Sequence, residues 1–309
     1  MCEQEWHEQE WREQVQRAPQ WQELIRAGVA QLAAAGVEST FPQVKWLAEA
    51  SAEKFPESFT AARSYFFHLL TQRAHHVPLA HLLGKMWFRY LELEARPGVF
   101  IVRPETELVA EAALNFLAKR ENPLVVDLCS GSGAIALALA TECPRAKVYG
   151  VEISAIAYES ALRNNARYGN PVIFLQGDAR TALCELADQV DLVITNPPYI
   201  PGGRELSPEV QADPEIALFG GGERGEELPR QLIAHSAQLL NPSGALIMEH
   251  DDTQGAALRA EAKKFFSQVQ TGQDYNGRER WLYAEGIAKD AAVSSENSAR
   301  QLPELRKSE

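Results

Sequence analysis

The chain has 309 residues, of which 45% are hydrophobic and 23% are charged, and this allows two domains that each bury a core. Its formal net charge is −12 at pH 7 and it contains no basic block, which disfavours a nucleic acid as the direct substrate. Its four cysteines form no CxxC pair, and no apolar run reaches the ~18 residues of a transmembrane helix. We therefore expect a cytoplasmic protein with reduced thiols, no bound metal and no membrane span.

The N-terminal part of the chain is expected to be helical and to carry no catalytic group. Residues 1–20 are rich in Glu and Gln and form an acidic extension. A first helix begins near Trp21 and ends at Gly36, Phe41-Pro42 marks the break before a second, and a third covers residues 59–73. The first helix places its apolar side chains on one face: Trp21, Leu24, Ile25, Val29 and Leu32. Such a bundle suits substrate recognition, or it merely stabilises the rest of the chain.

A change in pattern between residues 84 and 106 predicts a structured linker. Residues 86–93 and 99–102 are expected to pair as a β-hairpin around the turn Arg96-Pro97-Gly98. Thr106 is expected to be the N-cap of a helix over residues 107–119.

From residue 122 onward strands and helices alternate, which predicts a doubly wound, mostly parallel α/β sheet. A long Gly- and Pro-rich connection, residues 201–224, is expected to be a lid or a loop that contacts substrate. The predicted strands are residues 124–128, 147–153, 172–175, 190–195, 245–249, 268–271 and 281–285, and the predicted helices are 134–141, 155–168, 225–240 and 254–266.

A glycine-rich turn follows the first of these strands and opens a helix. Gly131 and Gly133 allow the backbone to turn tightly and to approach a ligand closely. With Ala136 the run also fits the dinucleotide fingerprint G-x-G-x-x-A, so a dehydrogenase has to be considered. The first glycine, Gly131, is only the third residue after the strand, which is unusual for a dinucleotide site. The predicted cofactor residues of this turn are Asp127, Cys129, Ser130, Gly131, Ser132 and Gly133.

Acidic residues end the next two strands. Glu152 can bind both hydroxyl groups of a ribose. Asp178, followed by Ala179, can accept a hydrogen bond from an adenine amino group, although an exposed turn aspartate explains the same residue equally well.

The motif Asn196-Pro197-Pro198-Tyr199 ends the strand over residues 190–195. Two prolines stop the strand abruptly, because neither can donate a ladder hydrogen bond. The Asn196 side-chain oxygen and the Pro197 carbonyl can each accept one N–H of a planar NH2 group, and Tyr199 can stack on that group. We therefore predict Asn196, Pro197 and Tyr199 as catalytic residues, all four as substrate-binding residues, and Asn196 also as a cofactor contact. A plain turn is the alternative interpretation.

With these motifs in this order, the chain resembles the HemK/PrmC family, the protein-(glutamine-N5) methyltransferases of peptide chain release factors. The resemblance covers about residues 21–286 and includes the segments at 78–84, 103–107, 196–200 and 277–280. It implies a Rossmann-like class I methyltransferase domain, S-adenosylmethionine as cofactor, and methylation of the glutamine in the Gly-Gly-Gln motif of a release factor. We also expect the protein to be a monomer. The implied parts are an extension (1–20), a helical substrate-recognition domain (21–83), a hairpin linker (84–106), the methyltransferase domain (107–286) and a disordered tail (287–309).

The sequence departs from the family pattern at a few positions. Val102 and Cys129 stand where the family usually has Pro and Gly, Glu152 replaces a more frequent Asp, and His250 follows Glu249 in place of a small apolar residue. These departures concern the identity of the substrate more than the cofactor or the chemistry, and other functions stay open beside the resemblance. The alternatives are an RNA or DNA amino methyltransferase acting on N2 of guanine or N6 of adenine, a dinucleotide-dependent oxidoreductase and a non-catalytic binding module.

Overall fold

The computed structural model describes residue 15 and residues 18–288, and it separates them into two units. The helical unit extends to Met86 and also includes Glu94–Pro97 and Glu205–Asp213, whereas the sheet unit contains Trp87–Leu93, Gly98–Arg204 and the chain from Pro214 onward. The predicted acidic extension and disordered tail fall almost wholly outside the described residues. No helix in the described part of the chain is long and apolar enough to cross a membrane.

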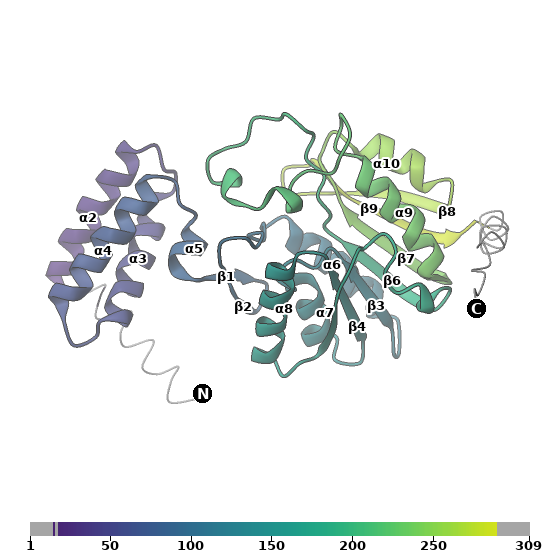
Figure 1. The fold of residues 1–309 in the computed structure, drawn as a ribbon, viewed down its shortest axis with the longest axis horizontal. Coiled ribbons are helices and arrows are strands. Elements are labelled where there is room, and N and C mark those ends of the chain that lie inside the picture. Colours follow the sequence, from purple (N-terminus) through teal and green to yellow (C-terminus); the bar gives the residue numbers. More distant parts are fainter. Residues whose placement is uncertain (1–14, 16–17, 289–309) are drawn as a thin grey trace, which may run out of the picture. The chain divides into compact units, whose positions relative to one another are not determined.

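In the described residues, the helical unit contains three longer α-helices and one short α-helix, which confirms the helical prediction (Figure 1). Fully buried side chains from each long helix form its core, among them Leu32, Val44 and Phe66. Helices α2 and α3 approach each other closely at Gly28, where a Cβ would lie 2.8 Å from the Val44 Cγ1. The helices are α2 (Pro19–Ala34), α3 (Thr40–Lys54), α4 (Phe59–Ala74) and α5 (Leu79–Leu83).

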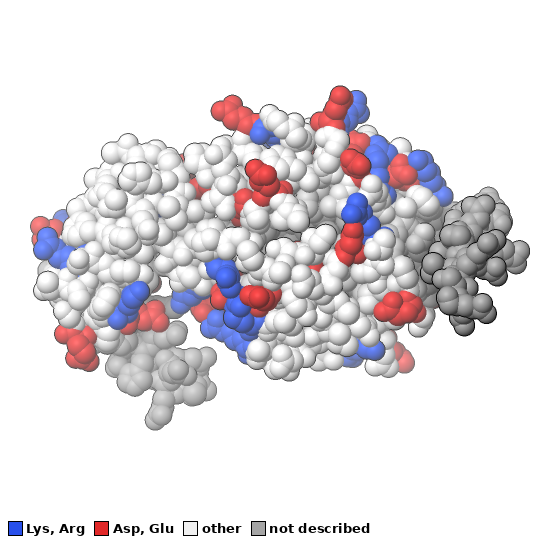
Figure 2. Space-filling model, viewed as in Figure 1, with Lys and Arg blue, Asp and Glu red and all other residues white. Residues whose placement is uncertain are grey.

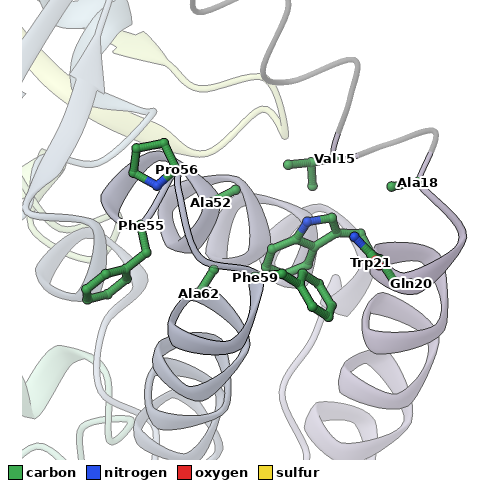
Figure 3. Close-up of a pocket in the computed structure, with 9 residues that line it drawn as sticks. All are labelled: Val15, Ala18, Gln20, Trp21, Ala52, Phe55, Pro56, Phe59 and Ala62. Atoms are coloured by element: carbon green, nitrogen blue, oxygen red, sulfur yellow. The ribbon is translucent and has the colours of Figure 1, made fainter.

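A pocket lined mainly by apolar residues lies at one end of this unit (Figure 3). The Trp21 ring packs edge-on against Phe59, with ring centroids 5.5 Å apart. The pocket lining comprises Val15, Ala18, Gln20, Trp21, Ala52, Phe55, Pro56, Phe59 and Ala62. It contains no titratable side chain, so the pocket itself offers no acid, base or nucleophile.

The junction between α2 and α3 confirms one prediction and corrects another. Gly36 has φ +76°, and the Val37 N–H bonds the Leu32 carbonyl at 3.0 Å, so Gly36 ends the helix as predicted. The predicted break at Phe41-Pro42 is wrong, because both residues lie in the first turn of α3. Proline is tolerated there since the first N–H groups of a helix have no intrahelical acceptor.

The linker contains a β-hairpin, but the predicted pairing of residues 86–93 with 99–102 is wrong. Strands β1 (Lys85–Phe88) and β2 (Leu91–Glu94) pair around Arg89-Tyr90, whereas residues 99–102 form no strand. Arg89 adopts φ +53°, which side-chain-bearing residues rarely do. Its guanidinium bonds both carboxylate oxygens of Glu142 at 2.6 and 2.8 Å. This contact between distant residues helps to hold a turn that the local sequence does not favour.

The sheet unit is a seven-stranded doubly wound sheet, as predicted. Its strand order is β5-β4-β3-β6-β7-β9-β8, in which the first five strands are parallel and β9 runs antiparallel to both of its neighbours, β7 and β8. The strands are β3 (Leu124–Leu128), β4 (Lys147–Glu152), β5 (Val172–Gln176), β6 (Val190–Thr195), β7 (Leu240–Glu249), β8 (Phe266–Gln273) and β9 (Glu279–Ile287).

Helices cover both faces of this sheet, so its central strands are nearly continuous runs of buried residues. Helices α6, α7 and α8 cover one face, and α9 and α10 cover the other (Figure 1). Their bounds are α6 (Thr106–Leu117), α7 (Ala134–Glu142), α8 (Ala155–Arg167), α9 (Glu227–Leu239) and α10 (Gly255–Ala262).

The order of the strands brings the sequence motifs together. Strand β3 pairs with β4 on one side and with β6 on the other, and Leu128 lies opposite both Val151 and Thr195. The chain order reverses between β3 and β6, and ligands of open α/β sheets bind at the carboxyl ends of strands at such a point. The glycine-rich turn after β3 and the Asn-Pro-Pro-Tyr motif after β6 therefore occupy the same edge.

Candidate active site

The turn after β3, here called the cofactor loop (residues 129–133), is shaped by three residues with positive φ. Cys129, Gly131 and Gly133 have φ values of +63°, +57° and +83°. Backbone hydrogen bonds hold the turn, with the Ser130 N–H bonding the Val151 carbonyl at 2.9 Å and the Gly133 N–H bonding the Ser130 carbonyl at 2.8 Å. Cys129 thus takes a backbone conformation that favours glycine, the residue common at this position in the family.

Gly131 and Gly133 lack a side chain for different physical reasons. A Cβ on Gly133 would lie 2.7 Å from the Phe174 ring, so this glycine allows α7 to begin close to β5. A Cβ on Gly131 would meet no atom within 4 Å. The loop therefore packs tightly on its Gly133 side and is open beside Gly131, where a ligand has room.

Asp127 supports the cofactor loop from inside the protein. Its side chain is fully buried, and its Oδ2 accepts a hydrogen bond from the Ala136 N–H at 3.2 Å. Its Oδ1 is buried and has no hydrogen-bond partner among the described residues. Burial raises the pKa of this carboxyl to about 7. The carboxyl thus contacts the first turn of α7, and direct contact between Asp127 and a cofactor stays a prediction.

Glu152 lies at the rim of the same loop. Its Oε2 accepts a hydrogen bond from the Gly131 N–H at 2.8 Å, and its Oε1 accepts one from the Ser154 N–H at 2.8 Å. Burial raises the pKa of this carboxyl, and the backbone hydrogen bonds oppose that effect. Each carboxylate oxygen keeps a further lone pair, so Glu152 can still accept hydrogen bonds from a ligand.

Asp178 is half-exposed and already paired. The Arg180 guanidinium donates to both of its carboxylate oxygens, at 2.5 and 3.0 Å to Oδ2 and 2.9 Å to Oδ1. The hydrogen bonds from Arg180 lower the pKa of Asp178. Ala179, the neighbouring candidate, is buried. This arrangement leaves the predicted contact between Asp178 and an adenine amino group untested.

The motif after β6, here called the acceptor corner (residues 196–199), is held by side chains from other elements. The Asn196 Nδ2 donates to the Thr106 Oγ1 at 3.1 Å, and the Tyr199 hydroxyl donates to the Glu249 Oε1 at 3.1 Å. The Gln254 side chain donates to the Tyr199 carbonyl at 2.8 Å. Pro197 and Pro198 are buried beneath the turn.

Two acceptor groups of this corner remain available. Among the described residues, no group donates a hydrogen bond to the Asn196 Oδ1 or to the Pro197 carbonyl. An Asn oxygen and a backbone carbonyl on adjacent residues can accept both N–H groups of one planar NH2. The corner can therefore bind an amide or an aromatic amine through that group.

Sequence reasoning missed three residues of this site. Thr106 was expected to be an N-cap, but it is the first residue of α6, its side chain makes no capping bond, and its hydroxyl contacts Asn196 instead. Glu249 ends β7 and Gln254 directly precedes α10. One sequence signal could have identified Glu249 as a site residue, namely an acidic residue at the carboxyl end of an otherwise apolar strand. The same signal identified Glu152.

Comparisons with known proteins agree with the geometry of this site. Residues 90–213 match the family model described as "Methyltransferase small domain". The release factor glutamine methyltransferase of Bifidobacterium longum (strain NCC 2705) is 39% identical over 288 residues, covering 85% of this chain and 98% of that protein. The release factor glutamine methyltransferase of Mycolicibacterium smegmatis is 41% identical over 280 residues, covering 86% and 97%.

A further relative carries a different name. The 4-amino-L-phenylalanine/4-methylamino-L-phenylalanine methyltransferase of Streptomyces pristinaespiralis is 43% identical over 202 residues, covering 63% of this chain and 68% of that protein. The two matches to release factor glutamine methyltransferases cover nearly the full length of those proteins. The matched part of this chain is longer than the sheet unit, so it also includes residues of the helical unit. The chain therefore belongs to the family of release factor glutamine methyltransferases, which are S-adenosylmethionine-dependent enzymes of the class I methyltransferase fold.

Proposed function

We propose that this protein, acting as a cytoplasmic monomer, transfers a methyl group from S-adenosylmethionine to the side-chain amide nitrogen of the Gly-Gly-Gln glutamine of a peptide chain release factor. The observation that carries the proposal is the pair of free acceptors at the acceptor corner, the Asn196 Oδ1 and the Pro197 carbonyl, beside a glycine-rich loop. The name shared by the relatives that match over nearly their full length supports the choice of a release factor.

The residues of the cofactor loop suit S-adenosylmethionine. The space beside Gly131 admits a ligand close to the backbone, and Glu152 keeps lone pairs for the ribose hydroxyl groups. Ile153 follows Glu152 and is 50% exposed, so an apolar side chain is available beside the ribose site to contact a flat base. When bound, S-adenosylmethionine supplies a methyl group on a positively charged sulfur.

The acceptor corner would act mainly by orientation. An amide nitrogen is a poor nucleophile because its lone pair is conjugated with the carbonyl group. Asn196 and Pro197 would accept its two N–H bonds and so direct the lone pair, while Tyr199, held by Glu249, would pack against the plane of the amide. Positioning and preorganised acceptors of this kind account for large rate enhancements. The proton can leave to water after the transfer, so no dedicated base is required.

The charge distribution favours a protein over a nucleic acid as the acceptor. On the face shown in Figure 2, one small group of Lys and Arg side chains lies beside acidic side chains, and the other Lys and Arg side chains are interspersed with Asp and Glu. A phosphate backbone requires clustered cations, whereas a glutamine in an exposed protein loop does not.

The proposal is tested by mass spectrometry of a release factor incubated with the protein and S-adenosylmethionine. We expect one added methyl on the Gly-Gly-Gln glutamine, and none on a release factor in which that glutamine is replaced by alanine. RNA, DNA and 4-amino-L-phenylalanine are offered in parallel reactions. Methyl transfer to one of these and none to the release factor would overturn the substrate assignment.

A further inference from the structure

Gln254 is a buried glutamine directly before α10, and its side chain joins three segments of the sheet unit. It is 1% exposed. Its Nε2 donates to the Tyr199 carbonyl at 2.8 Å and to the Arg224 carbonyl at 2.7 Å, and its Oε1 accepts from the Asp251 N–H at 3.1 Å. One carboxamide therefore links the acceptor corner to the end of the long connection over residues 201–224 and to the turn after β7.

The pattern of bonds requires a carboxamide in one orientation. A glutamine side chain has two N–H donors and one acceptor oxygen, and Gln254 uses all three groups. Turned by half a turn, its oxygen would face two carbonyl oxygens, and oxygen atoms without a hydrogen between them repel each other. A glutamate of the same shape can donate one hydrogen at most, so it cannot bond both carbonyls.

The long connection also returns to the acceptor corner through backbone contacts. The Ile200 N–H bonds the Leu218 carbonyl at 2.8 Å, and the Ile200 carbonyl accepts from the Gly220 N–H at 3.1 Å. A Cβ on Gly225 would overlap the Tyr199 carbonyl oxygen and would lie 2.7 Å from the Ile200 carbonyl carbon. The end of the connection is therefore packed directly on the backbone that follows the two prolines.

The acceptor corner is thereby anchored at both ends. Before it, Thr195 ends β6 and lies in the ladder with both neighbouring strands. After it, Gln254 holds the carbonyl of Tyr199. Pro197 and Pro198 lie between these anchors, and each fixes its φ, so few backbone rotations can absorb a shift of either end. The direction of the Pro197 carbonyl consequently depends on both anchors.

We propose that Gln254 is a positioning residue for methyl transfer. By holding the Tyr199 carbonyl against the end of the long connection, it keeps the Pro197 carbonyl directed at the acceptor nitrogen. This inference rests on the proposed function. It assigns a role to a residue outside the cofactor loop and the acceptor corner, and that residue acts through the backbone without touching the substrate.

The first test measures kcat and KM for methylation of a release factor by Q254M and Q254E. Methionine has nearly the length of glutamine but no donor, and glutamate has its shape but lacks the second donor. We expect both variants to lower kcat by about 10- to 100-fold, because the substrate nitrogen is no longer held in line. The KM for the release factor and the Kd of S-adenosylmethionine in calorimetry should change by no more than a few-fold.

N165L is the matched control. Asn165 is also a buried carboxamide, 4% exposed, and it bonds the Val172 carbonyl at 2.8 Å and the Val172 N–H at 3.1 Å. Val172 begins β5, so this contact lies at the amino end of the strand, away from the edge that carries the site. We expect N165L to lower the melting temperature, as Q254M does, but to keep the kcat of the wild type.

A pair of glycine variants tests the same anchor without changing Gln254. Gly225 and Gly169 both have positive φ, +68° and +82°, so alanine strains the backbone at either position. The Cβ of G225A would press on the Tyr199 carbonyl, whereas the Cβ of G169A would meet no atom within 4 Å. We expect G225A to lower kcat by about 10-fold or more and G169A to retain it.

Melting temperatures of all variants show whether a loss of kcat reflects unfolding, and the glycine pair decides if Q254M and Q254E fail to fold. A kcat for Q254M equal to that of N165L, or a kcat for G225A equal to that of G169A, overturns the inference while the proposed function stands. So does a wild-type kcat from Q254E. A wild-type protein that fails to methylate the release factor overturns the proposed function, and the inference with it.

Discussion

The cofactor loop and the acceptor corner lie at the same edge of the sheet but are held by different kinds of contact. The side-chain hydrogen bonds to the cofactor loop join Glu152 with Gly131, 21 residues apart, and Asn164 with Ser132, 32 residues apart. Asp127, directly before the loop, bonds Ala136, 9 residues away. The acceptor corner depends on partners 90 and 50 residues away, Thr106 for Asn196 and Glu249 for Tyr199.

This difference predicts different consequences of mutation. The cofactor loop connects β3 to α7, and its residues pack against α7 and β5, so changes there are expected to affect folding and cofactor affinity together. The acceptor corner leaves two acceptors free for a substrate, so changes there are expected to affect turnover with little effect on the cofactor.

The largest expected effect concerns the buried carboxyl beneath the cofactor loop. Burial raises the pKa of Asp127 from 3.8 to about 7, so the folded protein binds a proton that the unfolded chain has released between these pH values. The free energy of unfolding of the wild type should therefore fall, relative to that of D127N, as pH rises from 4 to 7. Three pKa units correspond to about 4 kcal/mol at most.

Urea unfolding of wild type and D127N at pH 5 and pH 8 measures this difference. E159Q is the control, because Glu159 lies on α8 with its side chain 63% exposed. The difference in free energy of unfolding between wild type and E159Q should be the same at both pH values. Equal differences between wild type and D127N at the two pH values would show that Asp127 does not carry a raised pKa.

The next effect distinguishes the acceptor corner from the loop. N196A removes the carboxamide oxygen that would accept a substrate N–H, and we expect kcat to fall by ~10²-fold or more, which is about 2.7 kcal/mol. The Kd of S-adenosylmethionine should remain nearly unchanged in calorimetry. N276A, in the turn between β8 and β9, serves as the control. An equal loss of cofactor affinity in N196A would contradict a role confined to the substrate.

A smaller effect is expected from G133A in the cofactor loop. The new Cβ would lie 2.7 Å from Phe174 at a residue with φ +83°, so both packing and backbone conformation are strained. We expect a loss of roughly 1–3 kcal/mol of stability and a weaker affinity for S-adenosylmethionine. G202A is the control, because its Cβ meets no atom within 4 Å and its φ is not positive. Unchanged stability and affinity in G133A would show that the loop is not packed as described.

Local patterns were sufficient for much of the fold. Apolar runs and glycine positions predicted β3 and β6 without error at either end, and Gly36 was identified as the end of α2. Errors occurred where a contact between distant residues outweighed local preference. Arg89 turns the hairpin because Glu142 binds its guanidinium, although Pro97-Gly98 is the stronger local turn signal.

The sequence by itself determined the chemical class of the site. Asn196, Pro197 and the glycines of the cofactor loop follow strands whose parallel order can be inferred from alternating apolar and helical patterns, and parallel strands bring their carboxyl ends to one edge. Only the tertiary structure decided how Asn196 is oriented. Its carboxamide has two chemically different ends of nearly equal shape, and its NH2 group donates to the Thr106 hydroxyl, which becomes a neighbour only when α6 packs beside β6.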